Sequence, residues 1–171
     1  MLLTTTRQWD ITTKVMDPSD KAPGRIACNT FVVGDLMDYD KVMEFGKNVD
    51  VLTIEIENVN TDALAALEEK GVKVYPQASV LKTIQNKCKQ KQFYKSNHIP
   101  TAAFKLFDSK DALKDAVGKG AVSFPFVWKS EAMGYDGYGV QIVRSISDLE
   151  SVSKGACMAE DLVAIDKELG V

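Results

Sequence analysis

Lys129 and the glycine-rich stretch directly after it are the residues of this sequence that most suggest chemistry. The hydrophobic run FPFVWK ends on Lys129, and the following SEAMGYDGYGV holds three glycines, Gly134, Gly137 and Gly139. A lysine at the mouth of a buried strand can extend its ammonium to a phosphate while its stem packs on apolar neighbours. Glycines let backbone N–H groups approach an anion closely. Two interpretations are open: an ordinary hairpin with a strand-end lysine, or a lid that closes over phosphates.

Carboxylates at three further places could bind a ligand. Glu160 and Asp161 end the run CMAED, and Glu168 follows a short turn, where a carboxylate could accept a hydrogen bond from a ribose hydroxyl. A solvated edge of a sheet explains these three equally well. Glu55 and Glu57 in TIEIEN have same-face spacing on an expected strand, which favours a ligand site at the carboxyl end of that strand.

Composition and charge exclude several classes of function. The 171 residues are 45% hydrophobic and 26% charged, which is typical of a globular protein. A net charge of −3 gives no electrostatic argument for binding nucleic acid, and the longest apolar runs are too short to span a bilayer. Three widely spaced cysteines indicate reduced thiols in a cytoplasm, and one histidine makes a zinc site improbable.

The elements that must position these residues fall into two parts. In residues 1–76, strands expected at 11–17, 30–35, 50–59 and 72–76 alternate with helices at 38–47 and 61–70, which predicts a parallel α/β sheet of the dinucleotide-fold type. Asn60 or Thr61 can cap the second helix and Gly71 can end it. Residues 77–171 begin with a long basic helix capped by Ser79, whose lysines fit a solvated amphipathic face.

A smaller α+β unit then follows. Strands are expected at 103–108, 124–129, 140–144, 157–163 and 167–171, with one helix capped by Ser109 and another near 147–153. The chain opens on a helical segment with no strand before it, although the central strand of such a sheet normally comes first. We therefore expect a piece of a longer protein, truncated at both ends.

Taken together, these residues resemble the ATP-grasp superfamily and, within it, the N5-carboxyaminoimidazole ribonucleotide synthetases of purine biosynthesis. The resemblance covers nearly the whole chain and rests on four stretches: TIEIENVNTDALAALEEKGVKVYP, LKTIQNKCKQKQFYKSNHIPTAAF, FPFVWKSEAMGYDGYGV and CMAEDLVAIDKEL. It implies a Rossmann-like pre-ATP-grasp domain at 1–76, and the start of an ATP-grasp domain at 77–171 with its lid at about 101–160.

The resemblance also implies a reaction and a set of site residues. ATP would phosphorylate bicarbonate to carboxyphosphate, and the amine of 5-aminoimidazole ribonucleotide would be carboxylated with release of ADP and phosphate. The implied groups that hold ATP phosphates are Lys87, Lys129 and the lid residues Gly134, Tyr135, Asp136, Gly137, Tyr138 and Gly139. Adenine would be bound by Glu160, Asp161, Leu162 and Val163, and ribose by Glu168. Tyr135, Asp136 and Glu55 would face the aminoimidazole nucleotide.

The sequence departs from the family in several places. The family's N-terminal G-x-G-Q-L-G stretch is absent, Lys87 stands where members often carry arginine, and Met133 replaces a usual glycine. The catalytic residues and the Mg²⁺-binding carboxylates are expected beyond Val171, so this chain alone should show little or no turnover. The full-length parent is expected to be a homodimer.

Two other interpretations stay open at this level. A sibling ATP-grasp ligase, such as a formate-dependent glycinamide ribonucleotide transformylase, shares the lysine, lid and E-I-E elements. A non-catalytic ATP-binding fragment would also fit the missing carboxylates.

Overall fold

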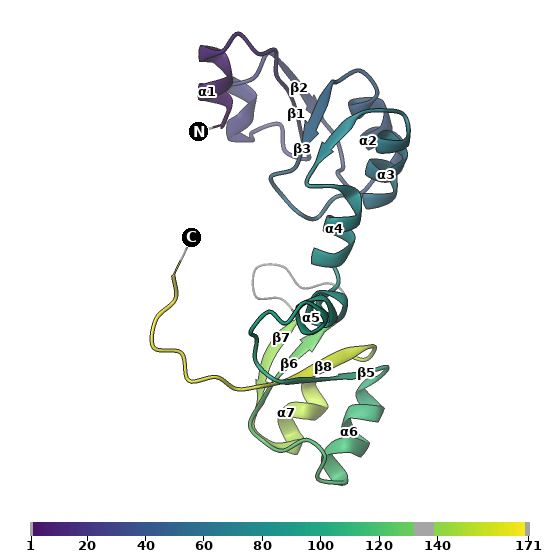
Figure 1. The fold of residues 1–171 in the computed structure, drawn as a ribbon, viewed down its shortest axis with the longest axis vertical. Helices are drawn as coiled ribbons and strands as arrows, with labels where there is room; N and C mark the ends of the chain where they lie inside the picture. The colour runs from purple at the N-terminus through teal and green to yellow at the C-terminus, as the bar shows by residue number, and fades with distance from the viewer. Residues whose placement is uncertain (1, 132–138, 170–171) are drawn as a thin grey trace. The chain divides into compact units, whose positions relative to one another are not determined.

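The structure, a computed structural model, describes residues 2–131 and 139–169 of the chain and divides it into two compact units. Unit 1 is Met1–Lys82 and unit 2 is Thr83–Val171. Figure 1 shows the helices and strands of both units, and each unit has its own hydrophobic core. Within the described residues, no helix is both long enough and apolar enough to cross a membrane.

Unit 1 alternates helices with short parallel strands. Its elements in chain order are α1 (Leu2–Gln8), β1 (Lys14–Asp17), η1 (Pro23–Ile26), β2 (Thr30–Val33), α2 (Tyr39–Gly46), β3 (Val51–Thr53), α3 (Thr61–Glu69), β4 (Lys73–Tyr75) and the start of α4 (Ala78–Ile84). β1 pairs with β2 and β3 pairs with β4, both in parallel, which confirms the predicted pairing. Among the described residues the four strands form two separate pairs and not one continuous sheet.

Helices α2 and α3 pack together and both contribute side chains to the hydrophobic core of unit 1. Asn60 caps α3, since its side chain accepts a hydrogen bond of 2.9 Å from the Ala63 N–H. Leu64 and Leu67 of α3 are completely buried. Gly46, the last residue of α2, lies so close to the side chain of Leu67 that a Cβ at this position would collide with it. The two helices can therefore approach closely only with glycine at this point.

The predicted strand at 50–59 is too long. β3 ends at Thr53, and the chain then bends through Glu55 and Glu57, which are both exposed. The two carboxylates therefore do not share a face of a strand as the alternating pattern predicted. They follow the carboxyl end of β3, where the sheet no longer imposes a two-residue period.

The long basic helix predicted after Ser79 is interrupted. The structure has α4 and then α5 (Lys87–Ser96), with Ser79 inside α4 and not at a cap. Asn86 starts the second helix: its backbone is extended, and its side chain accepts a hydrogen bond of 2.8 Å from the Lys89 N–H. An asparagine cap inside a helical pattern thus outweighs the helical periodicity on either side of it.

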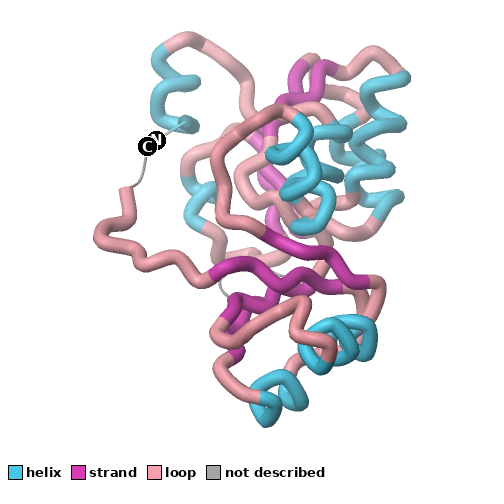
Figure 2. Tube along the Cα trace, turned by 60° about the horizontal axis from the view of Figure 1, so that its bottom comes forward, coloured by secondary structure: helices cyan, strands magenta, loops and turns pink. Residues whose placement is uncertain are grey.

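Unit 2 is built on a four-stranded antiparallel sheet with the strand order β5-β8-β6-β7. Its further elements are β5 (Phe104–Phe107), α6 (Lys110–Gly118), β6 (Phe126–Ser130), β7 (Val140–Val143), α7 (Ile146–Ser151) and β8 (Cys157–Asp161). Helices α6 and α7 lie on one face of the sheet and α5 lies on the other (Figures 1 and 2). The predicted α+β organisation is confirmed, although residues 167–169 form no strand.

Alternation along the strands divides the sheet of unit 2 into two chemically different faces. Phe126 and Trp128 of β6 point to the core that includes Leu113 of α6 and Leu149 of α7. The side chains between them, and those of the same face on β8, point to the side where α5 lies. One face of the sheet is therefore apolar core, and the other is available for polar side chains.

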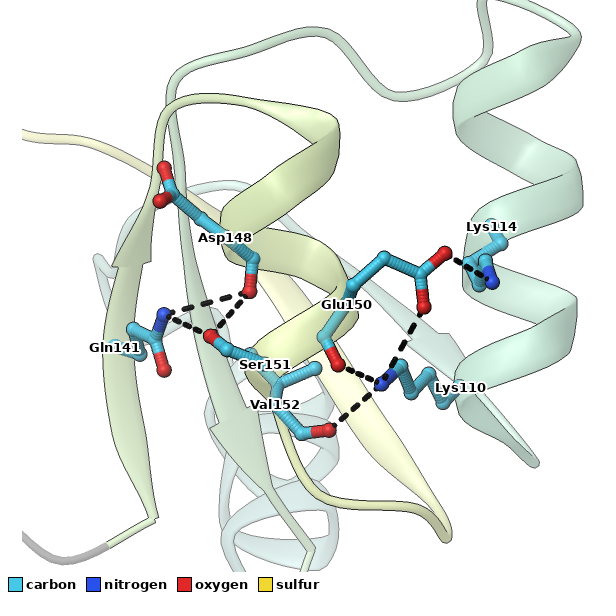
Figure 3. A network of polar contacts seen from close by, with 7 residues as sticks. All are labelled: Lys110, Lys114, Gln141, Asp148, Glu150, Ser151 and Val152. Atoms are coloured by element: carbon cyan, nitrogen blue, oxygen red, sulfur yellow. Dashed lines mark hydrogen bonds and ion pairs between the residues drawn. The ribbon is translucent and has the colours of Figure 1, made fainter.

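A polar network connects α6 and α7 below the sheet (Figure 3). The Lys110 ammonium donates hydrogen bonds to the carbonyl oxygens of Glu150 at 2.6 Å and Val152 at 2.9 Å. The Glu150 carboxylate forms an ion pair of 2.5 Å with Lys114. These contacts satisfy carbonyl groups at the end of α7 that the helix itself leaves unpaired.

We expect Lys110→Met to lower the free energy of unfolding of unit 2 by about 1–2 kcal/mol, because the carbonyl groups of Glu150 and Val152 lose a charged donor. Urea denaturation followed by circular dichroism measures this loss. Lys119→Met, at an exposed lysine that follows the same helix, is the matched control and should leave stability unchanged. Equal effects of the two substitutions would show that the Lys110 contacts contribute nothing specific.

Candidate functional site

A buried carboxylate held between two lysines is the main polar feature of the α5-facing side of the sheet. Glu160 Oε1 forms an ion pair with the ammonium of Lys91, and Glu160 Oε2 forms one with the ammonium of Lys129. The side chains of Glu160 and Lys91 are each 9% exposed, whereas that of Lys129 is 27% exposed. We call these three residues the Lys–Glu–Lys cluster.

Strand register explains why Lys129 and Glu160 meet. β6 and β8 are antiparallel neighbours, with Val127 opposite Glu160 and Lys129 opposite Met158. Lys129 is therefore the diagonal neighbour of Glu160 on the same face, a distance that a long side chain can span. Glu160 also lies opposite Phe104 of β5, so it stands in a central strand with neighbours on both sides.

Helix α5 brings the third member of the cluster onto this face. Cys88 and Lys91 are three residues apart, which places them on the same side of the helix, and both are buried. The Lys91 ammonium also donates a hydrogen bond to Thr101 Oγ1 and lies 5.7 Å from the centroid of the Phe104 ring. A hydroxyl, a carboxylate and the face of an aromatic ring thus surround this buried charge.

The cluster keeps Glu160 ionised. Burial by itself raises the pKa of the Glu160 carboxyl, but the contacts and charges of Lys129 and Lys91 outweigh it and hold the pKa below its ordinary value of 4.5. Glu160 therefore carries a full negative charge at neutral pH, and the two ammonium groups leave the cluster with one net positive charge. That surplus charge is favourable for an anion that reaches the more exposed lysine, Lys129.

The first turn of α5 lies beside the end of β6. The Lys87 N–H donates a hydrogen bond of 3.0 Å to the carbonyl oxygen of Glu131, the second residue after Lys129. On the other arm of the hairpin, Gly139 accepts a hydrogen bond of 2.9 Å from the Ser130 N–H and has a positive φ of 69°. Lys87, Lys129 and Gly139 therefore lie around one end of the β6–β7 hairpin.

The surroundings of the nearby Cys88 disfavour its thiolate form. Burial, followed by the charge of Glu131 and the presence of Cys157, raises the pKa of the Cys88 thiol to about 11. A thiol with such a pKa is protonated at neutral pH. Cys28, Cys88 and Cys157 are all free thiols.

The other predicted site residues are less closely grouped. Asp161 ends β8, where its N–H donates a hydrogen bond of 2.8 Å to the carbonyl oxygen of Ala103, and its side chain is exposed. Leu162, Val163 and Glu168 follow β8 in an exposed segment without regular structure. Glu55 belongs to unit 1.

The predicted lid residues Gly134, Tyr135, Asp136, Gly137 and Tyr138 lie outside the described residues, as does Met133. In the ranges that the structure covers, no group of three or more His, Cys, Asp or Glu side chains could hold a metal ion. The described residues thus do not fit a Mg²⁺ site.

Sequence reasoning missed the role of Lys91. It assigned the lysines of the basic helix to a solvated face, yet Lys91 is buried against Glu160, which lies 69 positions further along the chain. Its four-residue spacing from Lys87 and three-residue spacing from Cys88 mark the inner face of α5. The sequence of α5 alone does not indicate that Lys91 forms an ion pair, because its partner, Glu160, comes from the distant strand β8.

Two protein-family models match successive parts of the chain. A family model described as the ribonucleotide synthetase preATP-grasp domain matches residues 1–85, and one described as the ATP-grasp domain matches residues 92–171. The chain belongs to the ATP-grasp family, with a pre-ATP-grasp domain and part of an ATP-grasp domain.

Within this family the chain is similar to N5-carboxyaminoimidazole ribonucleotide synthetases. It is 30% identical to the N5-carboxyaminoimidazole ribonucleotide synthase of Staphylococcus epidermidis, over 92% of this chain and 42% of the relative. It is 34% identical to the chloroplastic phosphoribosylaminoimidazole carboxylase of Vigna aconitifolia, over 88% of this chain and 26% of the relative. The chain therefore spans less than half the length of these curated relatives.

The fold of the chain is also similar to those of solved carboxyaminoimidazole ribonucleotide synthases. The carboxyaminoimidazole ribonucleotide synthase of Aspergillus clavatus complexed with ATP superposes with a TM-score of 0.82 at 29% identity, covering 96% of this chain and 44% of that one. The same enzyme's complex with ADP and 5-aminoimidazole ribonucleotide gives a TM-score of 0.80 at 27% identity, with the same coverage.

Proposed function

We propose that this chain binds ATP at the Lys–Glu–Lys cluster, as part of an enzyme that carboxylates 5-aminoimidazole ribonucleotide. The overall reaction consumes ATP and bicarbonate and gives N5-carboxyaminoimidazole ribonucleotide, ADP and phosphate. The observation that carries the proposal is the net positive charge of the cluster, presented by Lys129 beside Lys87 and the start of the glycine-rich segment.

Each part of ATP has candidate partners in unit 2. Lys129 and Lys87 would hold phosphates, because ammonium groups form strong charge-assisted hydrogen bonds with phosphate oxygens. The segment Glu160–Val163 would bind adenine, where exposed backbone groups after β8 can pair with a base edge, and Glu168 would bind ribose. Gly134–Gly139 would cover the phosphates and exclude water, which protects a reactive acyl phosphate from hydrolysis.

The choice of second substrate rests on similarity. The Aspergillus clavatus synthase was solved in complex with ADP and 5-aminoimidazole ribonucleotide. The two curated relatives are named as a phosphoribosylaminoimidazole carboxylase and an N5-carboxyaminoimidazole ribonucleotide synthase. This supports the aminoimidazole nucleotide over glycinamide ribonucleotide. Glu55, Tyr135 and Asp136 are the side chains proposed to face it.

Isothermal titration calorimetry of the purified chain with ATP tests the proposal. We expect saturable binding with one site per chain. A second arm mixes the chain with ATP, bicarbonate and either 5-aminoimidazole ribonucleotide or glycinamide ribonucleotide with formate, and measures ADP. We expect little or no turnover in either mixture, because this chain spans 42% of the Staphylococcus epidermidis relative. Absence of ATP binding would contradict the proposal, and turnover only with glycinamide ribonucleotide would contradict the substrate assignment.

A further inference from the structure

The two lysines of the cluster are not equivalent partners of Glu160. Lys91 is buried and has two further contacts, the Thr101 hydroxyl and the face of the Phe104 ring. Lys129 is three times as exposed, and the part of the chain that the structure describes gives its ammonium one charged partner, Glu160. Lys91 is therefore a fixed inner partner, whereas Lys129 is an outer partner that can leave.

This asymmetry matters for anion binding at Lys129. A phosphate that binds the Lys129 ammonium must compete with Glu160 for it. As long as Lys91 stays paired with Glu160, the carboxylate keeps a counter-charge when Lys129 turns towards the phosphate. Without Lys91, the same movement would leave a buried carboxylate without any cationic partner, which is costly.

We propose that Lys91 is a positioning residue that holds and neutralises Glu160, so that Lys129 is free to bind a nucleotide phosphate. This rests on the function proposed above. Lys91 itself does not touch the nucleotide, since its ammonium is enclosed by Glu160, Thr101 and Phe104. Its effect on ATP must then pass through the charge of Glu160, which makes the idea testable by a double substitution.

The test measures the dissociation constant for ATP by calorimetry in Lys91→Met and in Lys91→Met with Glu160→Gln. Lys91→Met should weaken ATP binding about tenfold, because Glu160 then retains Lys129. Adding Glu160→Gln should lower the dissociation constant for ATP at least threefold relative to Lys91→Met alone. A neutral amide no longer retains the Lys129 ammonium. Thermal unfolding by circular dichroism establishes that each variant is folded at the assay temperature.

Two matched controls accompany these variants. Lys89→Met changes an exposed lysine on the same helix and should bind ATP like the unmodified chain. Adding Asp115→Asn to Lys91→Met removes an exposed carboxylate of α6, outside the cluster and the proposed ATP site, and should recover nothing.

Two results would overturn the inference. In the first, Lys91→Met binds ATP as tightly as Lys89→Met does. In the second, Lys91→Met weakens ATP binding, but adding Glu160→Gln does not restore any of the lost affinity. The second result would show that Lys91 acts through the packing of α5. Failure of the unmodified chain to bind ATP is a different outcome, because it would remove the proposed function itself.

Discussion

Lys129→Met is expected to weaken ATP binding by about 30- to 150-fold, which corresponds to a charge-assisted hydrogen bond of about 2–3 kcal/mol. Lys129 is the more exposed lysine of the cluster, and it lies near the end of β6, before the glycine-rich segment. The methionine side chain keeps the apolar stem and removes only the ammonium. Calorimetric titration with ATP measures the change.

The matched control for this substitution is Lys154→Met, at an exposed lysine in the loop before β8. It removes the same charge from unit 2 without touching the cluster, so a general electrostatic effect would appear in both variants. An ATP affinity of Lys129→Met within twofold of the control would contradict the assignment of Lys129.

Glu160→Gln should produce the largest loss of stability, about 3 kcal/mol in the free energy of unfolding of unit 2. The glutamine has almost the same shape, so the substitution creates no cavity. It leaves the Lys91 ammonium buried without a counter-charge, and breaking a buried ion pair on one side costs about this much. Asp161→Asn is the exposed control and should change stability very little.

Fluorescence can follow this unfolding selectively. The chain has two tryptophans, and Trp128 is buried in the core of unit 2 whereas Trp9 is exposed in unit 1. In a Trp9→Phe background, the emission of Trp128 reports unit 2 during urea denaturation. Equal midpoints for Glu160→Gln and Asp161→Asn would contradict the energetic role of the cluster.

Glu160→Gln should also change how the stability of unit 2 depends on pH. The pKa of Glu160 in the folded chain lies below its ordinary value of 4.5, so ionisation of this group favours the folded state. Its contribution is present above about pH 4.5 and is lost as the pH falls through the lower, folded-state pKa. The stability difference between the unmodified chain and Glu160→Gln should therefore shrink below pH 4.5. A difference that stays constant down to pH 3 would contradict this account.

Local signals predicted much of the fold because they act within a few residues. Asn60 and Ser109 cap helices α3 and α6 as predicted, since each side chain accepts a hydrogen bond from the backbone three residues later. Gly71 follows α3 with a φ of +90°, a conformation that glycine adopts without strain. The same kind of signal was overlooked at Asn86, which divides the predicted long helix.

Interactions between distant segments could not be predicted in the same way. The burial of Lys91 depends on a strand that is 69 positions away, and a lysine-rich helix alone gives no indication of which lysine faces inward. Glu55 was assigned to a strand by its alternating neighbours, but β3 ends at Thr53. The family resemblance, and not the local sequence alone, implied that Lys129 and Glu160 are site residues, and their ion pair follows from the register of β6 and β8.

The central claim is that ATP binds unit 2 at the Lys–Glu–Lys cluster, and an NMR titration of the ¹⁵N-labelled chain with ATP tests it most directly. We predict saturable chemical-shift changes of the backbone amides at Lys87, Lys129 and Glu160–Val163, with the same dissociation constant at each position. These changes should be largely lost in Lys129→Met and retained in Lys154→Met. Unchanged amide shifts at Lys129 and Glu160 at saturating ATP would contradict the account.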